Sequence, residues 1–234
     1  MRKIQYITVH CSAGYALIPA IEKYWYNTLK WKSPGYHIII YEDGTLWYVT
    51  KNGSYTTDVS KLDLNKVTNG VQGFNSNTVH ISYIGGVEKN NLSKAFDSRT
   101  PAQKKSIIEA IQLVQELLKK DGQDISKVKI QGHRDFSPDK NGNGVIDSWE
   151  RIKECPSFDA IPEYKNLIPQ SSIKTMYTLA DLNIRKDAGT QFEKIGTPIP
   201  KGDSVHFIET KGEWSKVIVL KDARVGYVSS KYLR

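Results

Sequence analysis

The chain has 234 residues, of which 39% are hydrophobic and 25% are charged. This composition is typical of a globular protein and argues against general disorder. No run approaches the roughly 20 apolar residues of a membrane span, so we expect none. The formal net charge of +8 predicts an acidic partner, which by charge alone is nucleic acid, a membrane surface or an anionic cell-wall polymer.

The two cysteines are too few for a disulfide framework, and a chain of this length buries a core without one. The N-terminal residues enter an alternating strand pattern directly and lack the apolar stretch of a secretory signal. We therefore expect no signal peptide and synthesis in the cytoplasm.

The first part of the chain combines predicted strands with one strong helix. Apolar and alternating patterns predict strands at residues 4–11, 36–50, 78–84 and 128–132. The second of these is a hairpin, because Asp43 and Gly44 supply the positive φ angles of a tight turn. Strands interspersed with helices predict an α/β fold in which helices cover a sheet.

The helix is predicted over residues 101–120. Thr100 is a candidate N-cap, Pro101 suits the first helical position, and Gln103 completes a capping box. Apolar residues then recur at helical spacing as far as Leu118, and Asp121 followed by glycine ends the helix.

The last part of the chain is predicted to be all-β. Short alternating runs separated by glycine- or aspartate-containing turns lie at 182–185, 204–209, 214–218 and 225–228. Pro162 and Pro169 precede them, and we interpret the end of the stretch 158–172 as a linker. The predicted domains are therefore residues 1–168 and 173–234.

Three residues far apart in the sequence have side chains that suit zinc. His10 ends the first predicted strand, His133 follows the fourth, and Cys155 precedes a proline. The ends of neighbouring strands lie close together in a sheet, so these residues can converge. Two imidazoles and a thiolate leave the fourth tetrahedral position open, which is the catalytic arrangement of zinc. Spacing alone does not distinguish such a site from three unrelated side chains.

The surrounding segments carry a family resemblance. They are 9–13, 35–40, 43–45, 75–78, 85–86, 100–103, 132–135 and 153–159. In sequence and in order they resemble the zinc-dependent N-acetylmuramoyl-L-alanine amidases of the phage-lysozyme type, which are related to the peptidoglycan recognition proteins. The resemblance covers roughly residues 1–165. It implies a mixed β-sheet flanked by helices, with the catalytic domain in residues 1–168.

The resemblance also implies a mechanism. Zinc would be bound by His10, His133 and Cys155, and the reaction would be hydrolysis of the amide that joins N-acetylmuramic acid to L-alanine. Tyr36 and Lys153 would line the zinc cleft, Tyr36 as a hydrogen-bond donor and Lys153 as a cation that stabilises the oxyanion. The alternative roles are a core aromatic residue and a solvated lysine.

The other histidines and the second cysteine are not expected to bind zinc. His37 is interpreted as structural or as lying behind the ligands, since it faces away from Tyr36. His80, where relatives tend to have a small residue, is interpreted as a partly buried structural histidine. His206 lies in the tail. Cys11 is expected to be a buried free thiol that points away from the zinc.

One segment departs from the family pattern. Relatives often carry a histidine shortly before the motif that begins at Asn75, and here Gln72 is the nearest polar residue. This departure concerns a contact with substrate and leaves the three zinc ligands unaffected.

Residues 139–150 fit the calcium loop of an EF-hand, with glycine at its sixth position. The oxygen ligands would be Asp139, Asn141, Asn143, Val145, Asp147 and Glu150. The alternative is an Asn-Gly-rich turn that needs no ion, and flanking helices are not obvious. A bound Ca²⁺ would brace the segment that carries Lys153 and Cys155.

The tail contains motifs of a second family, at residues 182–185, 200–203, 212–217 and 226–233. They resemble a bacterial SH3-type domain, which implies a small all-β SH3-like barrel over residues 173–234 that binds the cell wall. Trp214, Tyr227 and Tyr232 would offer stacking surfaces, although Trp214 and Tyr227 are also candidates for the barrel core.

The leading hypothesis is a monomeric two-domain zinc amidase that acts on peptidoglycan. A phage endolysin, made in the cytoplasm and released to the wall through a holin lesion, is favoured over a bacterial autolysin. One alternative is a non-catalytic peptidoglycan-binding protein, which the intact ligand set disfavours. A nucleic-acid binder is also disfavoured, because the basic residues are dispersed and no nucleic-acid motif is present.

Overall fold

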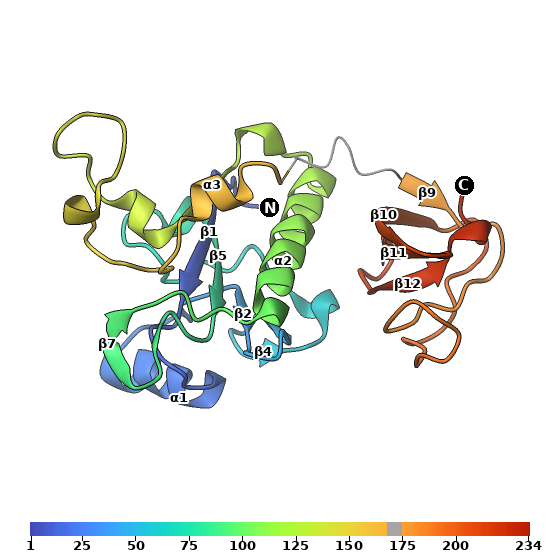
Figure 1. Ribbon diagram of the computed structural model, residues 1–234, viewed down its shortest axis with the longest axis horizontal. Helices are drawn as coiled ribbons and strands as arrows, with labels where there is room; N and C mark the ends of the chain where they lie inside the picture. The colour runs from blue at the N-terminus through green and yellow to red at the C-terminus, as the bar shows by residue number, and fades with distance from the viewer. Residues whose placement is uncertain (168–174) are drawn as a thin grey trace. The chain divides into compact units, whose positions relative to one another are not determined.

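The computed structural model describes residues 1–167 and 175–234. The chain divides into two compact units, Met1–Gln170 and Ser171–Arg234 (Figure 1). The linker expected near residues 168–172 lies outside the described residues. The first unit is a mixed sheet with helices and the second is all-β, so the predicted fold class is confirmed.

The first unit is built on a six-stranded sheet of order β4-β3-β2-β5-β1-β8. Strands β2, β5, β1 and β8 run parallel to one another, whereas β3 pairs antiparallel with β2 and β4. The strands are β1 (Tyr6–Cys11), β2 (Ile38–Ile40), β3 (Leu46–Val49), β4 (Tyr55–Thr56), β5 (Thr78–Tyr83) and β8 (Lys129–Gly132). All four predicted strand regions are therefore present, and the first strand begins two residues later than predicted.

The central strand β5 is buried along its whole length. This agrees with its place between β1 and β2, since a parallel strand inside a sheet covered on its faces has no solvent-exposed side. Helix α2 (Pro101–Lys120) contacts β5, β2 and β1. The sheet and this helix hold the strand ends that form the candidate site.

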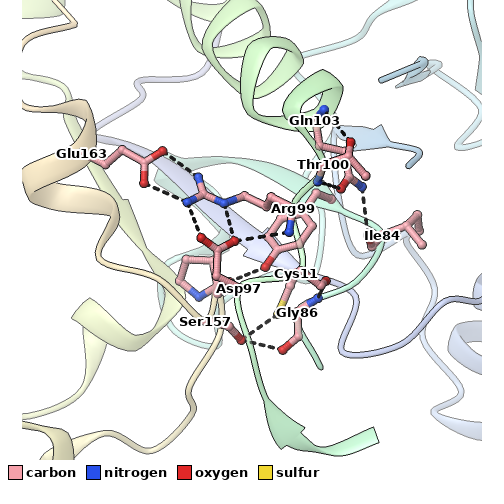
Figure 2. A network of polar contacts seen from close by, with 12 residues as sticks. Cys11, Ile84, Gly86, Asp97, Arg99, Thr100, Gln103, Ser157 and Glu163 are labelled. Carbon is pink, nitrogen blue, oxygen red and sulfur yellow. Dashed lines mark hydrogen bonds and ion pairs between the residues drawn. The ribbon is translucent and has the colours of Figure 1, made fainter. Parts of the chain in front are cut away.

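Helix α2 begins and ends where the sequence predicts. The Gln103 backbone N–H donates to Thr100 Oγ1 at 3.1 Å, and the Thr100 N–H donates to Gln103 Oε1 at 3.0 Å. This is the predicted capping box. Gln103 Nε2 also donates to the carbonyl of Ile84 at 2.9 Å (Figure 2). The cap therefore also ties the start of the helix to the chain just after β5.

Several short elements of the first unit were not predicted. They are α1 (Ile18–Lys23), the π-helical turn Tyr24–Thr28, β6 (Val87–Glu88), β7 (Asn91–Ala95) and α3 (Ala160–Tyr164). The start of α1 has no side-chain cap, and every residue of β7 is exposed. Neither element therefore carries the capping or alternation signals on which the sequence predictions rest.

The described residues of the first unit also contain five 3₁₀ turns. They are Val59–Lys61, Asn75–Asn77, Ile125–Lys127, His133–Phe136 and Ser148–Glu150. Among the described residues, no helix is long and apolar enough to cross a membrane.

The second unit contains a four-stranded antiparallel sheet of order β12-β11-β10-β9. The strands are β9 (Thr175–Tyr177), β10 (Ser204–Lys211), β11 (Trp214–Val219) and β12 (Val225–Ser229), and a 3₁₀ turn follows at Ser230–Tyr232. The strand predicted over residues 182–185 is wrong, because Leu182 and Arg185 form only isolated bridges. Leu182 instead belongs to the apolar core.

The tail aromatics differ in burial. Tyr227 is 5% exposed and belongs to the interior of the second unit, whereas Tyr232 is 38% exposed. Trp214 is half-buried. Of the two candidates for the barrel core, Trp214 and Tyr227, only Tyr227 is therefore buried.

Candidate metal centre

The fold brings His10, His133 and Cys155 together at one edge of the sheet. Their potential ligand atoms all lie within 4.8 Å of one another. His10 lies in β1, and His133 directly follows β8. These strands pair in parallel with Val9 opposite Gly132, so the next residue of each chain segment is a histidine at the same sheet edge. The register of β1 and β8 thus places His10 and His133 side by side, although more than a hundred residues separate them in the sequence.

One pair of potential donor atoms is spaced as in a zinc site. Cys155 Sγ lies 3.6 Å from His10 Nδ1, and two such ligands of a tetrahedral zinc ion are about 3.5 Å apart. The backbone N–H of Cys11 also donates to Cys155 Sγ at 3.2 Å, a contact that favours the thiolate. The residues present therefore fit a zinc ion held by two imidazoles and a thiolate.

The electrostatics of the site keep both imidazoles neutral. Burial, followed by the charges of His133 and Lys153, holds the pKa of His10 well below its usual range. Burial and then Lys153 lower the pKa of His133 to about 4. A neutral imidazole has a lone pair free for a metal ion. Burial raises the pKa of the Cys155 thiol, so metal binding there would release a proton.

Tyr36 lies beside the first ligand. Its ring centroid is 5.2 Å from that of His10, and the edge of Trp25 packs against it at 5.5 Å. The hydroxyl of Tyr55 donates to the Tyr36 carbonyl at 2.5 Å. Burial, and then the nearby Cys155, raise the pKa of Tyr36 above its ordinary value. The phenol therefore stays protonated and available as a hydrogen-bond donor.

Lys153 is exposed on the loop that leads to Cys155. Its charge contributes to the lowered pKa values of both His10 and His133. The ammonium group is thus close enough to act on the imidazoles while it remains in contact with solvent. The Tyr36 ring thus lies beside His10, and the charge of Lys153 acts on both candidate histidine ligands.

Comparison with known protein families identifies both parts of the chain. Residues 1–157 match the family model described as N-acetylmuramoyl-L-alanine amidase. The chain belongs to this amidase family. Residues 180–234 match the model of the bacterial SH3 domain. Both predicted family resemblances are therefore confirmed.

Individual relatives share part of the sequence with this chain. An endolysin of Klebsiella phage KP32 is 29% identical over 157 residues, which cover 65% of this chain and 80% of the relative. An endolysin of Enterobacteria phage T3 is 29% identical over 161 residues, with the same coverage. An uncharacterized protein of Haemophilus influenzae is 42% identical over 89 residues, covering 38% of this chain and 69% of that protein.

Solved structures of similar fold include two named proteins. The N-acetylmuramoyl-L-alanine amidase LysC from Clostridium intestinale is 19% identical, with a TM-score of 0.45. The match covers 70% of this chain and 85% of LysC. The peptidoglycan recognition protein PGRP-SA of Apis mellifera is 16% identical, with 72% and 86% coverage and a TM-score of 0.47.

The expectation that His80 is only partly buried is wrong. His80 is fully buried, and its Nδ1 lies 3.0 Å from Nε2 of His10. The contact arises because β5 is the neighbour of β1, with Thr8 opposite His80 and His10 opposite Ser82. Residues 80 and 82 share a face of β5, so the register of the two strands places the His80 ring beside His10.

His37 lies behind His80, which is not one of the three candidate ligands. The His80 backbone N–H donates to His37 Nδ1 at 3.0 Å, and His37 Nε2 is 2.8 Å from a guanidinium nitrogen of Arg2. His206 lies on β10 of the second unit and is outside the ligand group.

Cys11 is a buried free thiol, as expected. It does not simply point away, however, because its main chain contacts the Cys155 sulfur and its own Sγ lies 3.8 Å from Ser157 Oγ. Both cysteines therefore lie in one packed cluster at the candidate metal centre.

The loop that carries Cys155 is anchored on both sides. Tyr83 donates its hydroxyl to the Pro156 carbonyl at 2.7 Å, and the Ser157 hydroxyl donates to the Gly86 carbonyl at 2.7 Å. The Arg134 N–H donates to the Cys155 carbonyl at 2.8 Å. These contacts fix the sulfur relative to the sheet.

A buried arginine, which the sequence analysis did not single out, supports this loop. Arg99 forms ion pairs with Asp97 at 2.8 Å and Glu163 at 2.7 Å (Figure 2). Its guanidinium also lies over the ring of Phe158 at 3.2 Å. Arg99 therefore joins the start of α2, the helix α3 and the segment that follows Cys155.

The calcium-loop segment is closed by its own hydrogen bonds. Asp139 accepts the N–H groups of Gly142 at 2.7 Å and Gly144 at 2.8 Å. Glu150 is 1% exposed, and its Oε1 accepts the Lys140 N–H at 2.7 Å. A turn of this kind needs no ion to satisfy its carboxylates, so calcium binding stays a prediction.

Proposed function

We propose that this protein is a zinc-dependent amidase that hydrolyses the bond between N-acetylmuramic acid and L-alanine in peptidoglycan. The observation that carries the proposal is the convergence of His10, His133 and Cys155 in a chain of the amidase family. Three protein ligands leave a coordination position for chemistry, whereas a purely structural zinc site is closed by four.

The residues around this group suit hydrolysis of an amide. A bound zinc ion would act as a Lewis acid that polarises the scissile carbonyl and makes a water acidic enough to attack near neutral pH. Tyr36 donates its hydroxyl hydrogen to the oxygen on which negative charge develops. Lys153 supplies a positive charge to the same oxygen from the solvent side. Such groups lower the barrier because they are already oriented before the charge appears.

The relatives support a role in lysis of the cell wall. Those from Klebsiella phage KP32 and Enterobacteria phage T3 are named endolysins, and this chain adds a bacterial SH3 domain. The SH3 domain would hold the enzyme on the wall while the amidase domain cuts. We expect the protein to act on peptidoglycan as an endolysin released from the cytoplasm.

Digestion of purified peptidoglycan tests the proposal. The zinc-loaded protein should lower the turbidity of a wall suspension, and mass spectrometry of the products should find free L-alanine amino groups and intact lactyl groups. A chelator should stop the reaction, and added zinc should restore it. A zinc-loaded protein that sediments with walls of several chemotypes but releases no peptide would instead be a non-catalytic wall-binding protein.

A further inference from the structure

A second imidazole lies directly behind the first ligand. His80 Nδ1 is 3.0 Å from His10 Nε2, while the other ring nitrogen of His10, Nδ1, faces Cys155 Sγ at 3.6 Å. The two rings meet edge to face, with centroids 5.1 Å apart. His10 is therefore held between a sulfur on one side and an imidazole on the other.

This arrangement fixes which nitrogen of His10 carries a proton. A neutral imidazole has one N–H donor and one lone pair. If the Nδ1 lone pair binds the metal, Nε2 carries the proton and needs an acceptor. Histidine ligands of metals almost always donate this second N–H to an acceptor such as a carboxylate, a backbone carbonyl or a water, which orients the ring. Here the acceptor within reach is Nδ1 of His80.

The remaining contacts of His80 indicate that its ring serves this one bond. In the described part of the chain, its Nε2 is buried without a hydrogen-bond partner. A histidine buried only for structure would be expected to have both nitrogens satisfied. Its backbone is held separately, because its N–H donates to His37 at 3.0 Å and its carbonyl accepts the His37 N–H at 2.8 Å.

Room for the His80 ring depends on a glycine. A Cβ atom at Gly70 would collide with Cγ and Nδ1 of that ring. Gly70 does not have a positive φ, so its backbone does not require glycine and the space does. Gly70 and His80 therefore form a matched pair, in which the absent side chain of one admits the imidazole of the other.

We propose that His80 is a positioning residue, which accepts the Nε2–H of His10 and so presents the Nδ1 lone pair of that ligand to zinc. Gly70 provides the space in which it does so. This inference rests on the proposed zinc site and adds two residues to it. Neither residue touches the substrate or the metal.

Two substitutions of similar size separate this role from a structural one. His80→Leu removes the acceptor, whereas His80→Asn retains an oxygen near the position of Nδ1. We expect the leucine variant to bind zinc about 10- to 100-fold more weakly in competition with a chromogenic chelator, and the asparagine variant to stay close to the unsubstituted protein. A merely structural role predicts instead that the leucine variant binds zinc at least as tightly as the asparagine variant, because leucine suits a buried strand better than asparagine.

A double-mutant cycle tests the matched pair. Gly70→Ala should weaken zinc binding by displacing the His80 ring, but it should have little further effect when residue 80 is already serine, since the collision is then gone. Gly14→Ala is the control, because no atom lies within 4 Å of a Cβ at Gly14. It should leave zinc affinity unchanged.

NMR gives a readout that does not depend on lysis. The zinc-loaded protein should show a slowly exchanging imidazole proton on His10 Nε2, and His80→Leu should abolish it. Equal zinc affinities for the leucine variant and the unsubstituted protein would overturn the inference, even if lysis is normal. Failure of the unsubstituted protein to bind zinc would instead overturn the proposed function.

Discussion

At the scale of single residues, the two cysteines have different duties although both lie at the site. Cys155 is a candidate ligand of the proposed zinc ion, whereas Cys11 contributes a backbone N–H to the Cys155 sulfur at 3.2 Å. We expect Cys155→Ser to abolish zinc retention and lysis while circular dichroism shows both units folded. Cys11→Ser keeps the main-chain donor and should keep its zinc, as measured by metal analysis after gel filtration. Normal lysis by the Cys155 variant would remove this residue from the ligand set.

Buried neutral histidines also make the metal-free protein sensitive to acid. Burial, followed by the charge of Arg2, lowers the pKa of His37 to about 3 in the folded protein. In the unfolded chain a histidine side chain has a pKa of about 6.5. Between these values the unfolded state binds more protons, so the free energy of unfolding falls as the pH falls. His37→Gln should reduce this slope by about 1.4 kcal/mol per pH unit, measured by urea melts of chelator-treated protein at several pH values from 6.5 to 4. An unchanged slope would show that His37 is protonated in the folded state.

At the scale of elements, Arg99 links α2 and α3 to the Cys155 loop. Its side chain is 2% exposed, while those of Asp97 and Glu163 are 31% and 38% exposed. Arg99→Met should therefore cost about 2 to 3 kcal/mol, less than the loss of a fully buried pair, and should speed hydrogen exchange in α3. Lys127→Ala breaks an ion pair whose side chains are 83% and 53% exposed, and it should change stability by less than about 0.5 kcal/mol. Equal effects of the two substitutions would contradict this role for Arg99.

The loop over residues 139–150 is the second element whose role can be decided by experiment. Calcium titrated into chelator-treated protein should release heat if the EF-hand spacing reflects a site, and Asp139→Ala should remove that heat. Asp139 also accepts two backbone N–H groups, so a control for folding is needed, and circular dichroism of the variant provides it. No heat in the unsubstituted protein would leave the loop as an Asn-Gly-rich turn.

The elements also show what the sequence could predict. Helix α2 and the strands carry complete local signals, such as the Thr100 and Gln103 capping box, and the three candidate ligands lie in family motifs. The contact of His80 with His10 could not be predicted locally, because it depends on the register of two strands that are 70 residues apart. Arg99 looks like any surface charge in the sequence, since only folding brings Glu163 to it.

At the scale of the whole molecule, the two families indicate which acidic partner the positive charge serves to bind. The net charge of +8 is shared by both parts, and residues 171–234 hold 11 basic and 7 acidic side chains. Charge by itself admits several acidic partners. An amidase-family domain joined to a bacterial SH3 domain favours an anionic cell-wall polymer. We expect such a polymer to attract the protein at long range, whereas contacts within the candidate metal centre act at short range.

Long-range attraction to the wall and short-range contacts at the candidate metal centre should respond differently to salt. Screening shortens the reach of exposed charges from about 10 Å at 0.1 M ionic strength to about 3 Å at 1 M. Sedimentation with purified walls should therefore weaken as sodium chloride is raised over this range. Hydrolysis of a small soluble muropeptide should change much less, because the candidate ligands and Tyr36 lie in contact with one another. Wall binding that is independent of salt would mean that the second unit recognises uncharged groups, and exposed aromatics such as Tyr232 would then be the residues to substitute.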